Sequence, residues 1–264
     1  MTIPGPIKQI VRSGFSLFNL EIRRAQKHGC AAPDPMKGAN VLALAISDVL
    51  LRRAVNGKNY PEFTFVQIGA NDGLTVDPIR RFILKYGFRG VLVEPQPDVF
   101  QKLKSNYSGA QNLQFANVAI ARTSGTVSMY RFKNANADWA DCLATFSRET
   151  LLNNFHNVKG EVEELKIPAV TLPQLLETHG LKKLDLLQID AEGYDYEIIK
   201  AMGETSIRPE IIAFEPGFLS ISDQVECFAF LNSLGYAVNN NGPDTVAYRE
   251  PADQSLFRID VQAT

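Results

Sequence analysis

Short apolar runs alternate with amphipathic stretches along most of the chain, beginning near residue 63. The runs are rich in β-branched and aromatic residues, as in Phe63-Thr-Phe-Val-Gln-Ile68, which is typical of buried strands. The stretches between them repeat apolar positions at helical spacing and stop at breaker residues. We therefore expect strands at 63–68, 90–94, 113–120, 184–190 and 210–215, and helices at 78–86, 98–107, 173–179, 194–202 and 224–234. This alternation predicts a parallel sheet covered by helices on both faces.

Two segments depart from the alternation. Apolar runs at 236–240 and 245–249 flank Asn241-Gly-Pro-Asp244, which predicts a hairpin that closes the sheet with an antiparallel strand. Expected strands at 126–132 and 167–172 flank an irregular insertion, residues 133–166, that holds the only tryptophan, Trp139. Long insertions in compact domains often form lids or binding loops, so we expect this one to cover a ligand.

The first 60 residues form a separate helical extension in this interpretation, followed by one main domain over residues 61–264. Apolar positions between Ile7 and Phe18 predict one helix and residues 41–54 a second, separated by a breaker-rich loop at 29–38. Residues 1–28 carry five basic residues and one acidic residue, a local charge of +4. A basic amphipathic start can touch an anionic membrane surface, but a helix packed on the main domain is the commoner arrangement and is favoured here.

Composition places the chain among ordinary globular proteins. Of its 264 residues, 45% are apolar and 21% charged, and the net charge of −2 gives no reason to expect a nucleic-acid partner. The longest apolar run, Val41-Leu-Ala-Leu-Ala-Ile46, is too short to cross a bilayer, and the first residues do not resemble a secretory signal. Three widely spaced cysteines, Cys30, Cys142 and Cys227, suit a reducing compartment. We expect a cytoplasmic protein.

A glycine loop and an acidic residue indicate a nucleoside site. Gly69-x-x-x-Gly73 follows the first expected strand, where glycine permits a sharp turn and close approach to a ligand. The dinucleotide fingerprint would need glycines where Asn71 and Leu74 stand, which argues against a pyrophosphate over the loop. Glu94 ends the second strand, at the place where an acid in a doubly wound sheet accepts hydrogen bonds from ribose hydroxyls.

Further acids end two other expected strands, in Asp190-Ala-Glu192-Gly193 and at Glu215. Because the carboxyl ends of parallel strands share one edge, these acids should converge with Gly69 and Glu94 on one crevice. They can act as a general base, hold a metal, or cap the helices that follow. The three histidines are too far apart for a zinc site, although His156 lies in the insertion and is a candidate to face substrate.

Several segments resemble the FkbM-type S-adenosylmethionine-dependent methyltransferases. They are Phe65-Val-Gln-Ile-Gly-Ala-Asn-Asp-Gly73, Val93-Glu-Pro95, Asn117-Val-Ala119, Val170-Thr-Leu172, Leu187-Gln-Ile-Asp-Ala-Glu-Gly-Tyr-Asp195 and Arg208-Pro-Glu-Ile-Ile-Ala-Phe-Glu215. The resemblance covers about residues 60–250, and Ile-Asp-x-Glu-Gly is its most specific part. It implies a Rossmann-like class I methyltransferase fold with strand order 3-2-1-4-5-7-6. Gln67 stands where the family usually has an acid.

The resemblance implies methyl transfer from S-adenosylmethionine to an oxygen, a hydroxyl of a sugar or other secondary metabolite. It implies that the loop from Gly69 to Gly73 wraps the methionine end of the cofactor and that Glu94 holds its ribose. We expect Asp190, or else Glu192, as the base, and no metal. The full set of expected contacts is Gln67, Gly69, Asn71, Asp72, Gly73, Glu94, Asn117 and Asp190 for the cofactor, and Trp139, His156 and Glu215 for the small-molecule acceptor. The alternatives are a non-catalytic nucleoside-binding module and a dinucleotide-dependent oxidoreductase.

Overall fold

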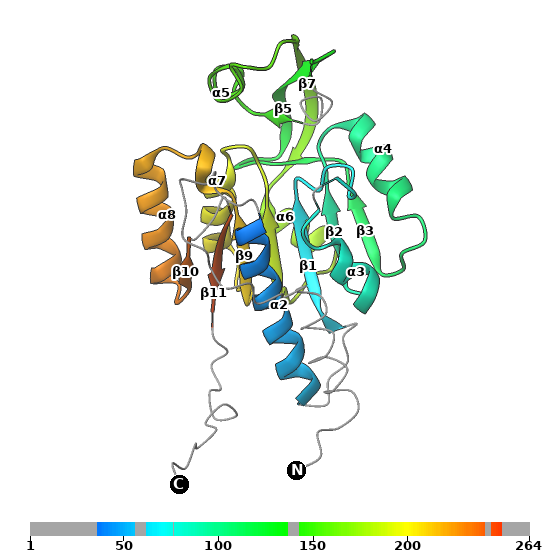
Figure 1. Cartoon of the computed structure of the whole chain (residues 1–264), viewed down its shortest axis with the longest axis vertical. Coiled ribbons are helices and arrows are strands. Elements are labelled where there is room, and N and C mark those ends of the chain that lie inside the picture. Colours follow the sequence, from blue (N-terminus) through cyan, green and yellow to red (C-terminus); the bar gives the residue numbers. More distant parts are fainter. Residues whose placement is uncertain (1–35, 56–61, 76, 137–142, 241–243, 250–264) are drawn as a thin grey trace, which may run out of the picture.

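The computed structural model describes residues 36–55, 62–75, 77–136, 143–240 and 244–249 (Figure 1). The helix expected between Ile7 and Phe18, the basic segment 1–28, Trp139, Cys30 and Cys142 lie outside these residues.

The main sheet has seven strands in the order β10-β11-β9-β8-β1-β2-β3. Pairing is parallel from β9 through β8, β1 and β2 to β3, and antiparallel where β11 joins β9 and β10. Counted within this sheet alone, the order is 3-2-1-4-5-7-6, so the predicted order and the closing hairpin are confirmed. The bounds are β1 (Thr64–Ile68), β2 (Arg89–Val93), β3 (Leu113–Ala116), β8 (Leu186–Ile189), β9 (Ile211–Phe214), β10 (Ala237–Asn239) and β11 (Thr245–Tyr248).

Helices cover both faces of this sheet because its inner strands are apolar on both sides. On β1, Val66 and Ile68 belong to one core, and Phe65 belongs to the other. The first core is completed by α6 (Leu172–Thr178), α7 (Asp195–Ala201) and α8 (Ile221–Ser233), with the short turns η3 (Met202–Glu204) and η4 (Pro216–Phe218) nearby. The second is completed by α2 (Met36–Val55), α3 (Arg80–Tyr86) and α4 (Pro97–Asn106). The predicted three-layer arrangement is therefore confirmed.

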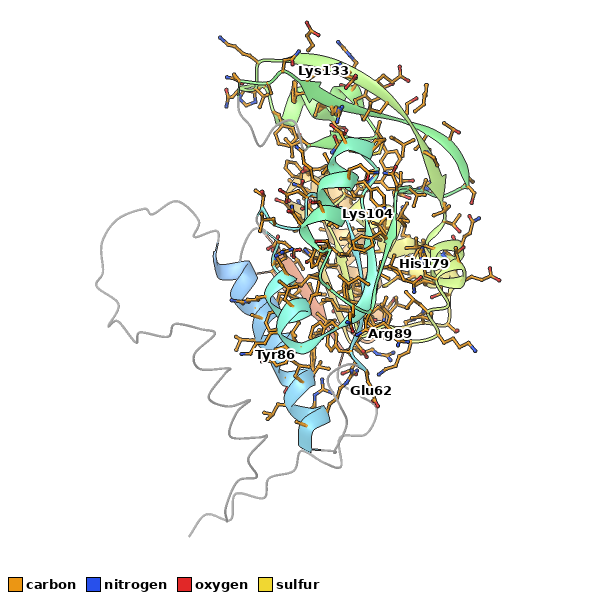
Figure 2. All side chains as sticks on the ribbon, turned by 90° about the vertical axis from the view of Figure 1, so that its right-hand side faces the viewer. Glu62, Tyr86, Arg89, Lys104, Lys133 and His179 are labelled. Atoms are coloured by element: carbon orange, nitrogen blue, oxygen red, sulfur yellow. The ribbon has the colours of Figure 1, made fainter. Side chains whose placement is uncertain are left out.

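A second, smaller sheet projects beyond the carboxyl end of the main sheet (Figure 1). Its order is β4-β7-β5-β6, and helix α5 (Arg148–Asn154) accompanies it. In the side view, Lys133 of this sheet lies at one end of the molecule and Glu62 and Arg89 lie toward the other (Figure 2). The strands are β4 (Ala119–Ile120), β5 (Gly125–Lys133), β6 (Ala144–Thr145) and β7 (Glu161–Val170).

This sheet corrects two predictions. The strand expected at 113–120 is two strands, since β3 ends at Ala116 and β4 joins the second sheet. The insertion at 133–166 is not irregular throughout, because β7 begins at Glu161 and pairs antiparallel with β5 as far as Lys133. The first six residues of β7 are exposed or half-buried, so they lack the apolar signal on which the prediction depended.

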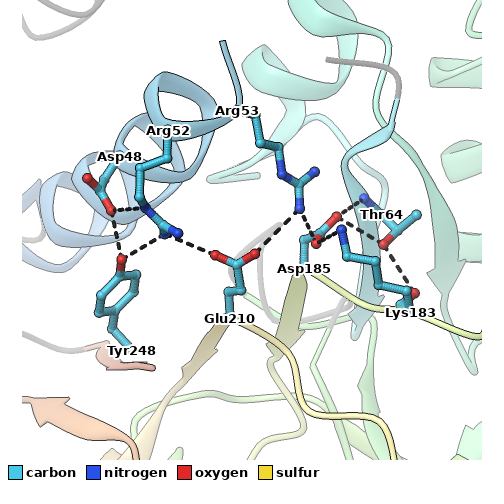
Figure 3. A network of polar contacts seen from close by, with 8 residues as sticks. All are labelled: Asp48, Arg52, Arg53, Thr64, Lys183, Asp185, Glu210 and Tyr248. Carbon is cyan, nitrogen blue, oxygen red and sulfur yellow. Dashed lines mark hydrogen bonds and ion pairs between the residues drawn. The ribbon is translucent and has the colours of Figure 1, made fainter. Parts of the chain in front are cut away.

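Helix α2 is fixed to the main sheet by a polar network at the amino ends of the strands (Figure 3). The Arg53 guanidinium pairs with the fully buried Asp185, which also accepts a hydrogen bond from the backbone N–H of Thr64 at 2.7 Å. Arg52 bonds Glu210 at 2.9 Å and donates to the Tyr248 hydroxyl at 2.7 Å. The network lies at the edge opposite the carboxyl ends of the strands, which leaves that carboxyl edge for a site.

Candidate active site

A cleft opens at the carboxyl ends of β1, β2 and β8, with the second sheet as its far wall. It encloses about 610 Å³, part of it open to solvent. The chain leaves β1 toward β2 on one side and leaves β8 toward β9 on the other, so the cleft lies at a switch point, where α/β sheets bind ligands. Its lining is Ile68, Gly69, Asn71, Glu94, Pro95, Gln96, Val118, Ala119, Ile120, Met129, Leu143, Ala144, Phe146, Asp190, Ala191, Glu192 and Ile198.

Glu94 follows β2 and has a carboxylate buried at the base of the cleft. Only 3% of the residue is exposed, and its two oxygens accept hydrogen bonds from the backbone N–H groups of Asn71 (3.0 Å) and Gln96 (2.9 Å). Burial raises the pKa of Glu94 to about 7, although those hydrogen bonds act in the opposite direction. Each oxygen keeps a lone pair for a further donor. Asn117 supports this arrangement, because its side-chain amide donates to the backbone oxygens of Glu94 (2.8 Å) and Pro95 (3.0 Å).

The two glycines of the first loop are required by packing of the protein on itself. Gly69 has φ +77°, and a Cβ there would lie 1.9 Å from the backbone oxygen of Asp190. Gly73 has φ +66°, and a Cβ there would lie 2.5 Å from side-chain atoms of Leu103 and Tyr107. Gly69 lines the cleft and Gly73 does not. The glycine spacing therefore allows the loop to pass close to β8 and α4.

Two other expected cofactor residues shape this loop and do not line the cleft. Asp72 accepts hydrogen bonds from the backbone N–H groups of Leu74 and Thr75, at 2.9 and 2.7 Å. Gln67 is buried in β1 and donates to the carboxylate of Asp77 over 3.4 Å. Asp77 in turn accepts from backbone N–H groups at the start of α3.

Five carboxyl side chains lie close together, four of them after β8 and β9 and one just before β11. Asp190 and Glu192 line the same cleft as Gly69 and Glu94, as predicted. Glu215 interacts with these acids from outside the lining, and Asp195 and Asp244 join the group. Within the described part of the chain, none of the five forms an ion pair. Burial, followed by the charge of Asp244, raises the pKa of Asp190 to about 6. Burial, followed by the charges of Asp190, Glu215 and Asp195, raises the pKa of Glu192 to about 9.

Glu192 and Asp195 differ in how their carboxyl groups are hydrogen-bonded. Glu192 adopts a left-handed backbone conformation (φ +49°), and its Oε2 has no hydrogen-bond partner among the described residues. Asp195 is fully buried and accepts from the backbone N–H groups of Gly193 and Glu215, each at 3.3 Å. It thereby joins the loop after β8 to the end of β9. Sequence reasoning missed Asp195, although it lies in the same acidic segment as Asp190 and Glu192.

The insertion contacts the loops that carry these acids. The ring of Phe146 lies 4.3 Å from that of Tyr194, and the ring of Phe155 lies 5.4 Å from that of Phe218. His156 is exposed beyond α5, with its Nδ1 3.4 Å from the backbone oxygen of Asn153, and it does not line the cleft. Glu215 interacts electrostatically with the other acids but also stands outside the lining.

Other chemistry is limited in the described ranges. No group of three or more His, Cys, Asp or Glu side chains there is arranged to hold a metal ion. Cys227 is buried in α8, and burial raises its thiol pKa to about 12, so it stays protonated. Among the helices described, none has both the length and the apolar character to span a membrane.

Comparison with known protein families gives a match over more than half of the chain. Residues 67–238, well over half of the chain, match the model of the methyltransferase FkbM domain. No curated protein matches the chain.

Solved structures that resemble the chain do so remotely. The methyltransferase FkbM from Methylobacillus flagellatus KT is 12% identical with a TM-score of 0.45, over 91% of this chain and 60% of that one. The precorrin-6y C5,15-methyltransferase from Geobacter metallireducens is 14% identical (TM-score 0.40; 72% and 80% covered). An RNA methyltransferase from Salinibacter ruber, in complex with S-adenosyl-L-homocysteine, is also 14% identical (TM-score 0.37; 85% and 97% covered). This chain thus spans less than two thirds of the first of these.

Proposed function

The chain belongs to the FkbM methyltransferase family, and we propose that it transfers a methyl group from S-adenosylmethionine to a hydroxyl oxygen of a small molecule, a sugar or another secondary metabolite. The observation that carries the proposal is the placement of Glu94, a buried carboxylate at the end of β2 in a cleft at the switch point of the sheet. A carboxylate there can accept hydrogen bonds from both hydroxyls of a ribose.

The residues of the cleft fit this cofactor. Both Glu94 oxygens are already oriented by backbone N–H groups and retain lone pairs toward the cleft. Gly69 and Asn71 line the adjoining wall, where the methionine end would lie. When bound, S-adenosylmethionine supplies an electrophilic methyl group on a positively charged sulfonium. Asp190 also lines the cleft, and the acids near it have no cationic partner among the described residues, so they complement that charge.

The two candidate bases differ in their protonation. With a pKa of about 6, Asp190 is ionised at neutral pH and can take the proton of an acceptor hydroxyl. In that transfer the hydroxyl oxygen would bond to the methyl carbon while the carbon–sulfur bond breaks and S-adenosylhomocysteine leaves. With a pKa of about 9, Glu192 is protonated at the same pH and cannot act as a base. A protonated Glu192 can instead donate a hydrogen bond to the acceptor. This difference favours Asp190 as the base and Glu192 as an acceptor contact.

The wall opposite Glu94 suits a ring with both apolar and hydroxyl faces. Met129, Leu143 and Phe146 present apolar surface to the cleft from the second sheet. Leu143 and Phe146 belong to the insertion, which contacts the loop after β8 through the rings of Phe146 and Tyr194, so the acceptor would bind between this apolar wall and the carboxyl side chains. The acceptor contacts expected of Trp139, His156 and Glu215 stay predictions.

Calorimetric titration of the full chain with S-adenosylhomocysteine, NAD and NADP tests the cofactor. Binding of S-adenosylhomocysteine alone is expected, and preference for a dinucleotide would replace this proposal with an oxidoreductase. The next measurement is mass spectrometry of hydroxylated metabolites incubated with S-adenosylmethionine and enzyme. Gain of one CH₂ by an acceptor, absent with the Asp190→Asn variant, supports methyl transfer. Cofactor binding without transfer to any acceptor tested would favour a non-catalytic nucleoside-binding module.

A further inference from the structure

Arg131 of β5 joins the second sheet to the start of α4. Its side chain is only 14% exposed. Nη1 donates to both carboxylate oxygens of Asp98, at 2.8 and 2.9 Å, and Nε donates to Glu163 of β7 at 3.0 Å. Asp98 lies in the first turn of α4, on the main sheet, whereas Glu163 lies beside Arg131 in the second sheet. One guanidinium thus connects the two sheets.

The same guanidinium reaches the proposed ribose site through one residue. Nη1 of Arg131 also lies 3.2 Å from the side-chain oxygen of Gln96, which is 1% exposed and lines the cleft. The backbone N–H of Gln96 donates to Glu94 at 2.9 Å. Gln96 therefore stands between Arg131 and the Glu94 carboxylate: its side-chain oxygen accepts from Arg131, and both its backbone N–H and its side chain hydrogen-bond Glu94.

The neighbouring cation on the same strand gives a matched comparison. Lys133 lies two positions further along β5 and pairs with Glu163 at 3.1 Å, but its side chain is 52% exposed. Exposed lysine pairs contribute little, whereas a partly buried guanidinium with several charge-assisted bonds is held firmly. The two cations share an acidic partner, and only Arg131 bonds Gln96 and Asp98.

We propose that Arg131 is a positioning residue for the cofactor: it fixes Gln96, and through it the orientation of Glu94, while holding the second sheet against α4. The proposal rests on the proposed function, because it takes the ribose as the group that Glu94 binds. It makes the second sheet a part of the cofactor site, beyond its role as the roof over the acceptor.

The test measures affinity for S-adenosylhomocysteine and for its 2′,3′-dideoxy analogue by calorimetry. Arg131→Met is expected to weaken S-adenosylhomocysteine about tenfold, as when one charge-assisted hydrogen bond is lost. It should change the affinity of the dideoxy analogue far less, because that analogue offers no ribose hydroxyls to Glu94. Lys133→Met, which removes the neighbouring cation of β5, should leave both affinities unchanged.

A double-variant cycle with Glu94→Gln separates positioning from general loosening of the sheet. If Arg131 acts through Glu94, adding Arg131→Met to Glu94→Gln should cost much less affinity than it costs alone. Three outcomes overturn the inference, even where Glu94→Gln alone weakens binding. They are full additivity of the two variants' affinity losses, equal weakening of both ligands by Arg131→Met, and unchanged affinity in Arg131→Met. If Arg131→Met does not fold, Arg131→Gln, which keeps a polar side chain and removes the guanidinium, takes its place in the same cycle. Failure of the parent chain to bind S-adenosylhomocysteine overturns the proposed function, and this inference with it.

Discussion

The protonation of Glu94 should make cofactor affinity depend on pH. Its carboxylate is buried, and its pKa is about 7. Ribose hydroxyls donate hydrogen bonds, so the ionised carboxylate binds them and the protonated one loses an acceptor and adds a competing donor. We therefore expect affinity for S-adenosylhomocysteine to rise as the pH rises through about 7.

The size of the effect follows from the ionised fraction. With a pKa of about 7, roughly one carboxyl in eleven is ionised at pH 6 and ten in eleven at pH 8. If only the ionised form binds, the apparent dissociation constant is about tenfold larger at pH 6 than at pH 8. Binding at pH 6 should also release a proton, because the hydroxyls favour the ionised form.

Calorimetry at pH 6, 7 and 8, in two buffers of different ionisation enthalpy, measures both affinity and proton release. Glu94→Gln, which keeps the shape but cannot ionise, should bind more weakly at pH 8 and lose the tenfold dependence. Glu161→Gln removes an exposed acid of the second sheet and serves as the matched control. If the Glu94→Gln variant shows the same pH dependence as the parent, the carboxylate does not hold the ribose.

Three further predictions concern other carboxyl groups. Asp190→Asn should lower turnover about 10²–10⁴-fold and abolish the rise of activity through pH 6. It should change the affinity for S-adenosylhomocysteine little. A large loss of that affinity would instead make Asp190 a cofactor residue. Glu192→Gln should raise the free energy of unfolding of the ligand-free protein at pH 8 by about 1–3 kcal/mol in denaturant titrations. The reason is that folding raises the pKa of Glu192, so the parent protein loses stability as the pH rises toward that pKa. An equal gain at pH 5 would contradict this reasoning. Asp185→Asn should cost about 3–5 kcal/mol at pH 7, because it removes the buried carboxylate that pairs with Arg53 and leaves the guanidinium with Glu210, at 3.6 Å, as its remaining charged partner. A loss under 1 kcal/mol would show that the Arg53–Asp185 pair is not needed to fix α2.

The main sheet could be predicted from sequence because every inner strand is a short apolar run. β1, β2, β8 and β9 are buried on both faces, so each gives a continuous signal bounded by glycine, proline or acidic residues. The order of the strands came from the resemblance to a family. Periodicity alone indicates a parallel sheet and does not order its strands.

The strands expected at 126–132 and 167–172 are confirmed as β5 and the end of β7. The second sheet as a whole escaped prediction because the first part of β7 lacks an apolar signal and β4 and β6 have two residues each. β7 begins with Glu161-Val-Glu-Glu-Leu-Lys and is stabilised by pairing with β5, a contact across the whole insertion. Likewise, the break between β3 and β4 falls within a mostly apolar segment, at the point where Asn117 bonds the backbone that follows β2. Both features depend on contacts between segments distant in the sequence, and local pattern does not encode them.

In the candidate site, too, some features could be predicted from the sequence and others depend on contacts between distant segments. The convergence of Asp190, Glu192 and Glu215 follows from the rule that parallel strands share a carboxyl edge. The requirement for glycine at position 69 follows from the backbone oxygen of Asp190, which comes from a strand more than a hundred residues later. The sequence therefore predicted that the acids after β8 and β9 meet, whereas the part played by Asp195, the protonation of the acids and their supporting contacts needed the fold.

Buried carboxyl groups have opposite pKa shifts at the two ends of the main sheet. At the amino end, burial alone would raise the pKa of Asp185, but the hydrogen bond and charge of Arg53 lower it (Figure 3). At the carboxyl end, Asp190 and Glu192 have no cation beside them among the described residues, and burial, followed by the charges of neighbouring acids, raises their pKa values. The paired acid favours the folded state at neutral pH, and the unpaired acids disfavour it. Buried acids with raised pKa values gather at functional sites, so this contrast supports the proposal that the active site lies at the carboxyl edge of the sheet.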